Sequence, residues 1–296
     1  MTIRLLPRQR INATAWDACV AASPHRIVYG YSWYLDAVTS LPDWSWAGLV
    51  VMDGCTDYQT VIPVPLRRKR GRWVVHQPLF CQFLAIYSRD ENADPTPFFE
   101  VMQQRFHYGS VLNCQQIPNT PSLRLQTRQL HTHTLSLTSD YESIARNYSR
   151  DRTLNLRRAE AAHWQVVNSD DPEPLIYLFR ENHAADIPNG VAPWAYVLFG
   201  RLFAELQKRG LITLRYALNG GVVHAGALFV RDRNRLIYLF NAASDAGRRG
   251  NARTLLIDQI IRDNAGSHGL VFDFESPEKP SVVQFYESFG AMAEPF

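Results

Sequence analysis

The chain has 296 residues, of which 46% are hydrophobic and 20% charged, with 31 basic and 28 acidic side chains. This composition excludes a disordered or collagen-like chain, and the length suits one large domain or two of ordinary size. A net charge of +3 is too small to mark nucleic acid as the default partner. No apolar stretch reaches the ~18 residues of a membrane-spanning helix.

The N-terminal residues carry Arg4, Arg8 and Arg10 but no long apolar run after them. The sequence therefore predicts no signal peptide and a cytoplasmic location. The cysteines are far apart and form no C-x-x-C pair, which argues against a zinc site and a disulfide framework. We expect free, mostly buried thiols at Cys19, Cys55, Cys81 and Cys114.

The first part of the chain alternates short helices with a run of strands. Asp53-Gly54 is a turn between two strands, and the basic run Arg67–Arg72 leads into a third. In chain order we expect helices at 14–22 and 32–40, strands at 46–52, 60–66 and 72–76, a helix at 95–108, and strands at 110–115 and 131–137.

A new pattern begins at Ser139, because Glu142 follows it by three residues as in a capping box. We place a domain boundary here, between domains 1–138 and 139–296. The second domain is expected to contain helices at 140–147, 150–162, 172–186, 193–209, 248–264 and 280–288, and strands at 164–168, 212–218, 222–230, 236–241 and 270–275.

The two halves resemble each other in one respect. A strand, a turn at Asp53-Gly54, a second strand and a third recur about 165 residues later around Asn219-Gly220. Hairpins mixed with helices, closing on a strand and a helix, predict an α/β fold of mixed α+β character and exclude all-α and all-β folds.

The segment after the strand at 236–241 has the pattern of an anion site. Small residues let backbone amides approach a phosphate, the start of a helix adds partial positive charge, and arginines add full charges. The candidate binding residues are Phe240, Asn241, Ala242, Arg248, Arg249, Gly250, Asn251, Ala252 and Arg253.

The stretch Val283–Ala291, with Phe285-Tyr286 in an apolar helix, resembles the late helix of GNAT acyltransferases. Tyr286 follows Gly250 by 36 residues, a spacing similar to that between the pyrophosphate loop and the tyrosine in that fold. The basic stretch Ser149–Ala159 is similar to the start of the second domain in the FemAB-like or CelD-like branch. This resemblance implies two tandem GNAT-like domains, each a mixed, mostly antiparallel sheet flanked by helices.

The sequence also departs from that pattern. Gly247 stands where a glutamine or arginine is expected, with Arg248 one place later, and Pro277 and Pro280 precede the last helix. These differences alter the expected phosphate geometry and leave Tyr286 in place.

The resemblance implies attack of an amine on the thioester of acetyl-CoA or another acyl-CoA, without a metal. Tyr286 would protonate the leaving thiolate, and amides near Phe240–Ala242 would polarise the carbonyl. Asp273 and Glu275, on one face of a strand, and His224 are candidate bases.

Each candidate also has a purely structural interpretation. Tyr286 is a core aromatic if its hydroxyl is satisfied locally. Independently of this, His224 is a core or rim histidine and not a base. Asp273 caps a turn or pairs with an arginine. The run Arg67–Arg72 is a solvated hairpin tip or holds a phosphorylated or tRNA-like substrate. His131 and His133 share a strand face but lack a third ligand for a metal.

The sequence thus predicts an N-acyltransferase whose amine acceptor, a small molecule, a peptide or a sugar, lies between the two domains. One alternative is a FemABX-type transferase that uses aminoacyl-tRNA, motivated by the basic stretches at 67–72 and 146–158. Another is a non-enzymatic binding protein of envelope or polysaccharide biosynthesis.

Overall fold

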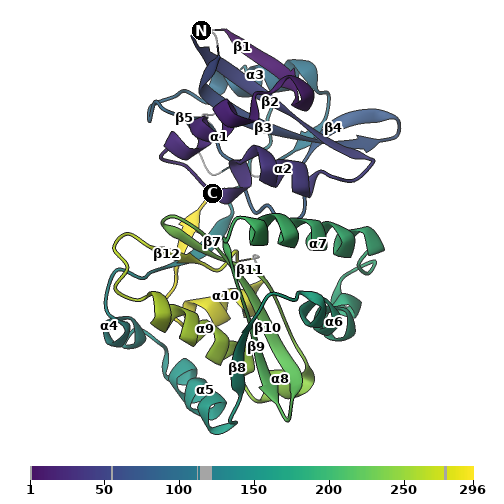
Figure 1. Cartoon of the computed structure of the whole chain (residues 1–296). Helices are drawn as coiled ribbons and strands as arrows, with labels where there is room; N and C mark the ends of the chain where they lie inside the picture. Colours follow the sequence, from purple (N-terminus) through teal and green to yellow (C-terminus); the bar gives the residue numbers. More distant parts are fainter. Residues whose placement is uncertain (1, 55, 112, 114–121, 277–278) are drawn as a thin grey trace. The chain divides into compact units, whose positions relative to one another are not determined.

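The computed structural model describes residues 2–54, 56–111, 113, 122–276 and 279–296 (Figure 1). Contacts divide the chain into two compact units, each with its own sheet. Unit 1 extends to Gln129 and includes Val197–Glu205 and Phe296; unit 2 comprises Leu130–Tyr196 and Leu206–Pro295. Unit 2 thus begins at Leu130, before Ser139. The domain boundary after residue 138 stays a prediction.

Unit 1 contains a six-stranded sheet of order β1-β2-β3-β4-β6, with β5 paired to β3. Its pairs are antiparallel except that of β4 with β6. The strands are β1 (Ile3–Pro7), β2 (Trp44–Asp53), β3 (Asp57–Lys69), β4 (Arg72–His76), β5 (Tyr87–Ser88) and β6 (Gly109–Ser110). The sheet is therefore mixed and mostly antiparallel, as predicted.

Both faces of this sheet are covered, so the side chains of β2 are buried without interruption from Trp46 to Val51. The helices are α1 (Ala13–Ala22), α2 (Ser32–Val38) and α3 (Thr96–Arg105), with short 3-10 turns at Arg8–Arg10 and Val28–Gly30. A Cβ on Gly48 would lie 2.3 Å from the Trp16 ring of α1, so only glycine permits this approach. Leu49 packs with Phe98 of α3.

Unit 2 contains a seven-stranded sheet of order β13-β7-β12-β11-β10-β9-β8. Only β11 and β12 pair in parallel. The strands are β7 (His131–Ser136), β8 (Gln165–Ser169), β9 (Ile212–Asn219), β10 (Val222–Asp232), β11 (Arg235–Ala243), β12 (Val271–Asp273) and β13 (Met292–Pro295). The antiparallel runs β2-β3-β4 and β9-β10-β11 confirm the repeated hairpins.

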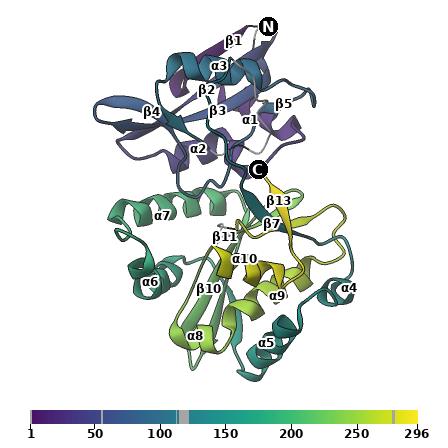
Figure 2. The ribbon, with the colours of Figure 1, turned by 180° about the vertical axis from the view of Figure 1, so that it is seen from behind.

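The helices after residue 130 are α4 (Tyr141–Ala145), α5 (Arg150–Ala161), α6 (Glu173–Asn182), α7 (Pro193–Lys208), α8 (Asp245–Arg249), α9 (Ala252–Asn264) and α10 (Pro280–Glu287), with a 3-10 turn at Ala184–Asp186. Figures 1 and 2 show α9 and α10 on one face of the unit 2 sheet and α6 on the other. The α9 side buries a large core that includes Phe229, Leu256 and Phe272.

Three local predictions were wrong in detail. Asp140, not Ser139, is the N-cap of α4, because its side chain accepts the Ser143 amide at 2.8 Å. The helix expected at 248–264 is interrupted at Asn251, whose φ of 55° is left-handed. The strand expected at 270–275 ends at Asp273, since Glu275 has a φ of 46°.

Cys19 and Cys81 are free and buried, and burial raises the pKa of the Cys19 thiol to about 11. Cys55, Cys114, Pro277 and much of the strand expected at 110–115 lie outside the described residues. Within the part of the chain that the structure describes, no helix is long and apolar enough to cross a bilayer.

Candidate functional site

The loop between β11 and α9 owes its glycines to packing. A Cβ on Gly247 would lie 2.2 Å from the carbonyl oxygen of His224, and one on Gly250 would lie 2.3 Å from the ring of Trp164. The Trp164 Nε1 donates a hydrogen bond to the Gly250 carbonyl at 2.8 Å. These glycines therefore shape the loop, and close approach of a phosphate is not needed to explain them.

The start of α9 has the features of an anion site. Asn251 precedes the helix in the left-handed region, and no side chain caps it, so the first amides are available to a ligand. Arg253 lies in the first turn, and its Nη1 donates to the Asn241 Oδ1 at 3.0 Å. Arg249 is exposed, whereas Ala252 is fully buried. Amides and two arginines thus face the same end of the helix.

The Arg248 side chain already has partners within the fold. It forms an ion pair with Asp245, and its Nη1 donates to the carbonyl oxygen of Ala243 at 3.0 Å. Its charge is therefore less available to a ligand than those of Arg249 and Arg253.

The pairing of β11 with β12 ends at Ile237, well before the end of β11. The strand pairs with β12 only from Arg235 to Ile237, whereas its pairing with β10 continues to Ala243. Near the end of β11, the Ala243 amide donates to the Nε2 of His183 at 3.1 Å. Burial, helped by nearby arginines, lowers the pKa of His183, so the imidazole is neutral and can accept this bond. Sequence reasoning missed His183.

The candidates Phe240, Asn241 and Ala242 lie along this segment of β11. A register shift separates Tyr238 from Phe240, so Phe240 packs against Phe179 of α6 at 4.8 Å between ring centroids. Asn241 instead contacts Arg253, and Ala242 is fully buried.

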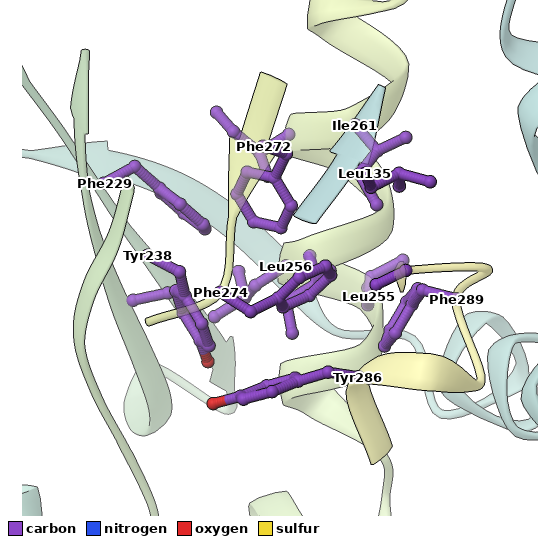
Figure 3. Packing of buried hydrophobic residues seen from close by; sticks show 14 of the residues in the cluster. Leu135, Phe229, Tyr238, Leu255, Leu256, Ile261, Phe272, Phe274, Tyr286 and Phe289 are labelled. Carbon is purple, nitrogen blue, oxygen red and sulfur yellow. The ribbon is translucent and has the colours of Figure 1, made fainter. Parts of the chain in front are cut away.

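Tyr286 lies beside a second tyrosine that the sequence did not single out. The ring centroids of Tyr238 and Tyr286 are 6.3 Å apart, and both hydroxyls point to the same side (Figure 3). The Tyr238 hydroxyl is buried without a hydrogen-bond partner, and the described residues provide none for Tyr286. An unpaired buried hydroxyl costs about 1–3 kcal/mol. A bound polar group would remove this cost.

Charged groups act on this pair of tyrosines. Burial raises the pKa of both phenols, while the Arg253 cation opposes the rise. The carboxylates of Glu275 and Asp273 raise the pKa of Tyr286 further. Tyr286, Arg253, Asn241 and Glu275 are therefore gathered in one region.

The two candidate carboxylates have different surroundings. Burial raises the pKa of Glu275 to about 8, which suits a general base near neutral pH. Asp273 is fully buried and accepts hydrogen bonds from Thr132 Oγ1 at 2.7 Å and Arg235 Nε at 2.8 Å. Asp273 also accepts the Glu275 amide at 3.0 Å. It therefore orients the turn that carries Glu275.

His224 lies away from Tyr238 and Tyr286. It lies on β10 five positions before Phe229, which pairs with Tyr238, so roughly 16 Å of strand separates it from the tyrosines. Its Nδ1 is 3.0 Å from the Ser244 Oγ, and its ring lies near Trp164. These contacts fit a residue that supports the loop.

Arg152 of α5 is a further residue that the sequence did not single out. It is 5% exposed, and its guanidinium lies 4.2 Å from the ring centroid of Phe285 and 4.5 Å from that of Phe289. It donates to Ser288 Oγ at 2.9 Å and Thr254 Oγ1 at 2.5 Å. Burial lowers the pKa of this cation to about 10. Arg152 thus ties the first turn of α9 to the helix of Tyr286.

Metal ligands do not gather in this region. Among the described residues, no group of three His, Cys, Asp or Glu side chains could hold a metal ion. His133 of β7 instead lies 3.6 Å from a carboxylate oxygen of Glu287.

Comparisons with known proteins agree with the fold. Residues 145–278 match the acetyltransferase (GNAT) domain model. The FemX structure shares 12% identity at a TM-score of 0.67, covering 99% of this chain and 95% of that one. A tandem GNAT protein from the clavulanic acid biosynthesis pathway, determined without AcCoA, shares 13% at 0.54, covering 99% and 96%.

A conserved protein of unknown function from Bacteroides thetaiotaomicron shares 11% identity at a TM-score of 0.54, covering 96% of this chain and 97% of that one. No curated protein matches the sequence. Residues 145–278, somewhat less than half of the chain, thus resemble an acetyltransferase (GNAT) domain, and the chain as a whole has a tandem GNAT-like fold.

Proposed function

We propose that the chain is an N-acyltransferase that moves an acyl group, acetyl in the first instance, from acyl-CoA to an amine. The observation that carries this proposal is the convergence, in the region of Glu275, of the Tyr238 and Tyr286 hydroxyls, which have no hydrogen-bond partner among the described residues. The GNAT domain match supports acyl transfer as the reaction class. The acceptor is an amine of a small molecule, peptide or sugar.

The start of α9 is the proposed site for the pyrophosphate of CoA. Its uncapped amides, Arg249 and Arg253 fit a group with two negative phosphates. The buried guanidinium of Arg152 stabilises this turn through Thr254. These residues supply charge without the glutamine or arginine expected at Gly247.

In the proposed reaction, Glu275 accounts for the proton that moves and Tyr286 for the hydrogen bond to the sulfur. The neutral amine attacks the thioester carbonyl carbon, Glu275 takes a proton from the nitrogen, and the carbon–sulfur bond breaks to release a thiolate. Burial keeps the Tyr286 phenol protonated, so it donates a hydrogen bond to the leaving sulfur. Protonated Glu275, with a pKa of about 8, is close in acidity to a thiol of about 8.5 and can return the proton to it.

This assignment changes the role first expected for Tyr286. A phenol of ordinary pKa, about 10, is within about two units of a thiol near 8.5 and could pass its proton to the departing thiolate at a small cost. The buried Tyr286 is a weaker acid, so it stabilises the developing negative charge chiefly as a donor.

The test is binding and turnover with the full chain. Calorimetry with CoA and acetyl-CoA should show binding that Arg249→Gln and Arg253→Gln weaken, and release of free thiol should follow addition of an amine panel. Tyr286→Phe should lower turnover while acetyl-CoA binding persists. Absence of both binding and thiol release would refute the proposal.

The aminoacyl-tRNA alternative makes the opposite prediction. Such an enzyme would bind aminoacyl-tRNA in a salt-dependent way and would not bind CoA. A non-enzymatic protein would bind neither donor and would be recovered from extract in a stable complex.

A further inference from the structure

A basic hairpin tip in unit 1, residues 67–73, has no part in the proposed acyl transfer. Its sequence, RRKRGRW, contains five cationic side chains and no acidic one. β3 and β4 carry it away from the rest of unit 1 (Figures 1 and 2). The tip is thus a separate, projecting feature of this unit.

Stability does not explain this composition. Lys69 and Arg72 are directly opposite in the β3–β4 pair, and like charges at opposed positions destabilise a hairpin. Arg70 has a left-handed φ of 48°, where glycine or asparagine is favoured. In the described part of the chain, Arg68, Lys69, Arg70 and Arg72 form no ion pair. These four charges therefore have no acidic partner among the described residues, whereas the Arg67 guanidinium lies over the Trp44 ring.

Exposed aromatic side chains accompany these cations. Trp73 is 44% exposed and Tyr108 is 61% exposed. The Tyr108 carbonyl accepts the Val75 amide at 3.3 Å, which places Tyr108 alongside β4. Tryptophan and tyrosine are the side chains that favour the headgroup region of a bilayer.

We infer that the basic hairpin tip docks on the surface of an anionic phospholipid bilayer. Its four exposed cations, Arg68, Lys69, Arg70 and Arg72, lie within five consecutive residues, so a flat surface can meet them together, at about a fivefold gain in binding for each Lys or Arg near the headgroups. Trp73 and Tyr108 then enter the headgroup region.

A nucleic acid suits this surface less well. Specific nucleic-acid interfaces extend over about 1,000 Å² or more, and single strands follow a basic groove. The whole chain has a net charge of only +3, so the cations of the tip are offset by acidic residues elsewhere. An RNA partner is accordingly an outcome that would overturn the inference.

The test is cosedimentation of the full chain with vesicles. Binding is expected to vesicles of phosphatidylcholine and phosphatidylglycerol in equal parts, not to phosphatidylcholine alone, and salt should release it. The triple variant Arg68→Gln/Lys69→Gln/Arg72→Gln should lower the partition coefficient roughly a hundredfold. Trp73→Ala should lower it at unchanged charge.

A matched control separates the tip from net charge. Arg150→Gln/Arg157→Gln/Arg158→Gln removes the same charge from exposed positions of α5 and should leave vesicle binding within a fewfold of the wild type. Thermal unfolding checks that both triple variants fold. Equal loss in both, absence of wild-type binding, or binding to tRNA that depends on the tip without binding to vesicles would each overturn the inference. None of these outcomes depends on acyl transfer.

Discussion

The rings of Tyr238 and Tyr286 meet edge to face with 6.3 Å between their centroids, and neither hydroxyl bonds to a described residue. Phenylalanine would fill the same space in an apolar core without the cost of desolvating a hydroxyl. The packing of β11 against α10 therefore accounts for two aromatic rings and leaves two polar atoms unexplained. A ligand between the hydroxyls and Glu275 would explain both.

Tyr238→Phe should consequently separate stability from activity. We expect the free energy of unfolding to stay the same or rise by about 1 kcal/mol, because no hydrogen bond is lost. Turnover of acetyl-CoA with an amine should fall about tenfold or more. Denaturant unfolding and thiol release measure the two effects.

Tyr148→Phe is the matched control for this experiment. The Tyr148 hydroxyl donates to the buried Asp258 Oδ1 at 3.1 Å, so its loss should cost about 1–2 kcal/mol and leave turnover of the folded enzyme unchanged. If Tyr238→Phe behaves like Tyr148→Phe, the Tyr238 hydroxyl is structural.

Glu275 should set the pH dependence of the reaction. A base must be unprotonated, and the pKa of Glu275 is about 8, so kcat/KM should rise with pH and level off above 8. Glu275→Gln should remove this dependence and lower the rate by about 10²–10⁴. A variant that retains the same rise would show that another group is the base.

The Glu275 carboxyl should also make stability depend on pH. A rise in pH should lower stability, whereas it raises kcat/KM. The pKa of Glu275 is about 8 in the folded chain against an ordinary 4.5, so the folded state holds the proton more tightly. The resulting stabilisation is complete below pH 4.5 and is lost as pH rises through 8, by at most about 5 kcal/mol. Denaturant unfolding across this interval should show the decline in the wild type and not in Glu275→Gln.

Arg152 should be required for the packing of three helices. Arg152→Met removes the bonds to Ser288 and Thr254 and the contacts with two rings, and should cost about 2 kcal/mol. Arg152→Lys should not restore the lost stability, since an ammonium lacks the planar fork of a guanidinium. Arg157→Met, exposed on the same helix, should stay within about 0.5 kcal/mol. Equal effects at both positions would contradict the assignment.

Local patterns predicted most of the fold. The strand at 72–76 and the helix starts at 150, 193 and 280 agree with the structure, because hairpin turns and capping residues act over a few positions. The break at Asn251 was not predicted, although Arg248–Asn251 carries no apolar side chain and Gly250-Asn251 is typical of a turn. Its cause is tertiary, since Trp164 fills the space at Gly250.

The candidate site was predictable only in part. Motif spacing pointed to Tyr286 and Arg253, whereas Tyr238 reads as one more apolar strand residue. Whether its hydroxyl has a partner depends on helix α10, which is distant in sequence. A signal did exist for Arg152, since it shares the helical spacing of the buried Leu156 and Ala159. The basic composition of that stretch concealed it.

Asp273 distinguishes a structural carboxylate from a base. Its buried ion pair with Arg235 spans 2.8 Å, and removing one partner of such a pair leaves an uncompensated charge that costs about 3–5 kcal/mol. Asp273→Asn should therefore lower the free energy of unfolding by this amount. Glu294→Gln, which removes the half-exposed partner of Arg235 at 3.4 Å, should cost less than about 1 kcal/mol. If Asp273→Asn keeps the stability of the wild type and loses turnover, Asp273 is a base and Glu275 loses its assignment.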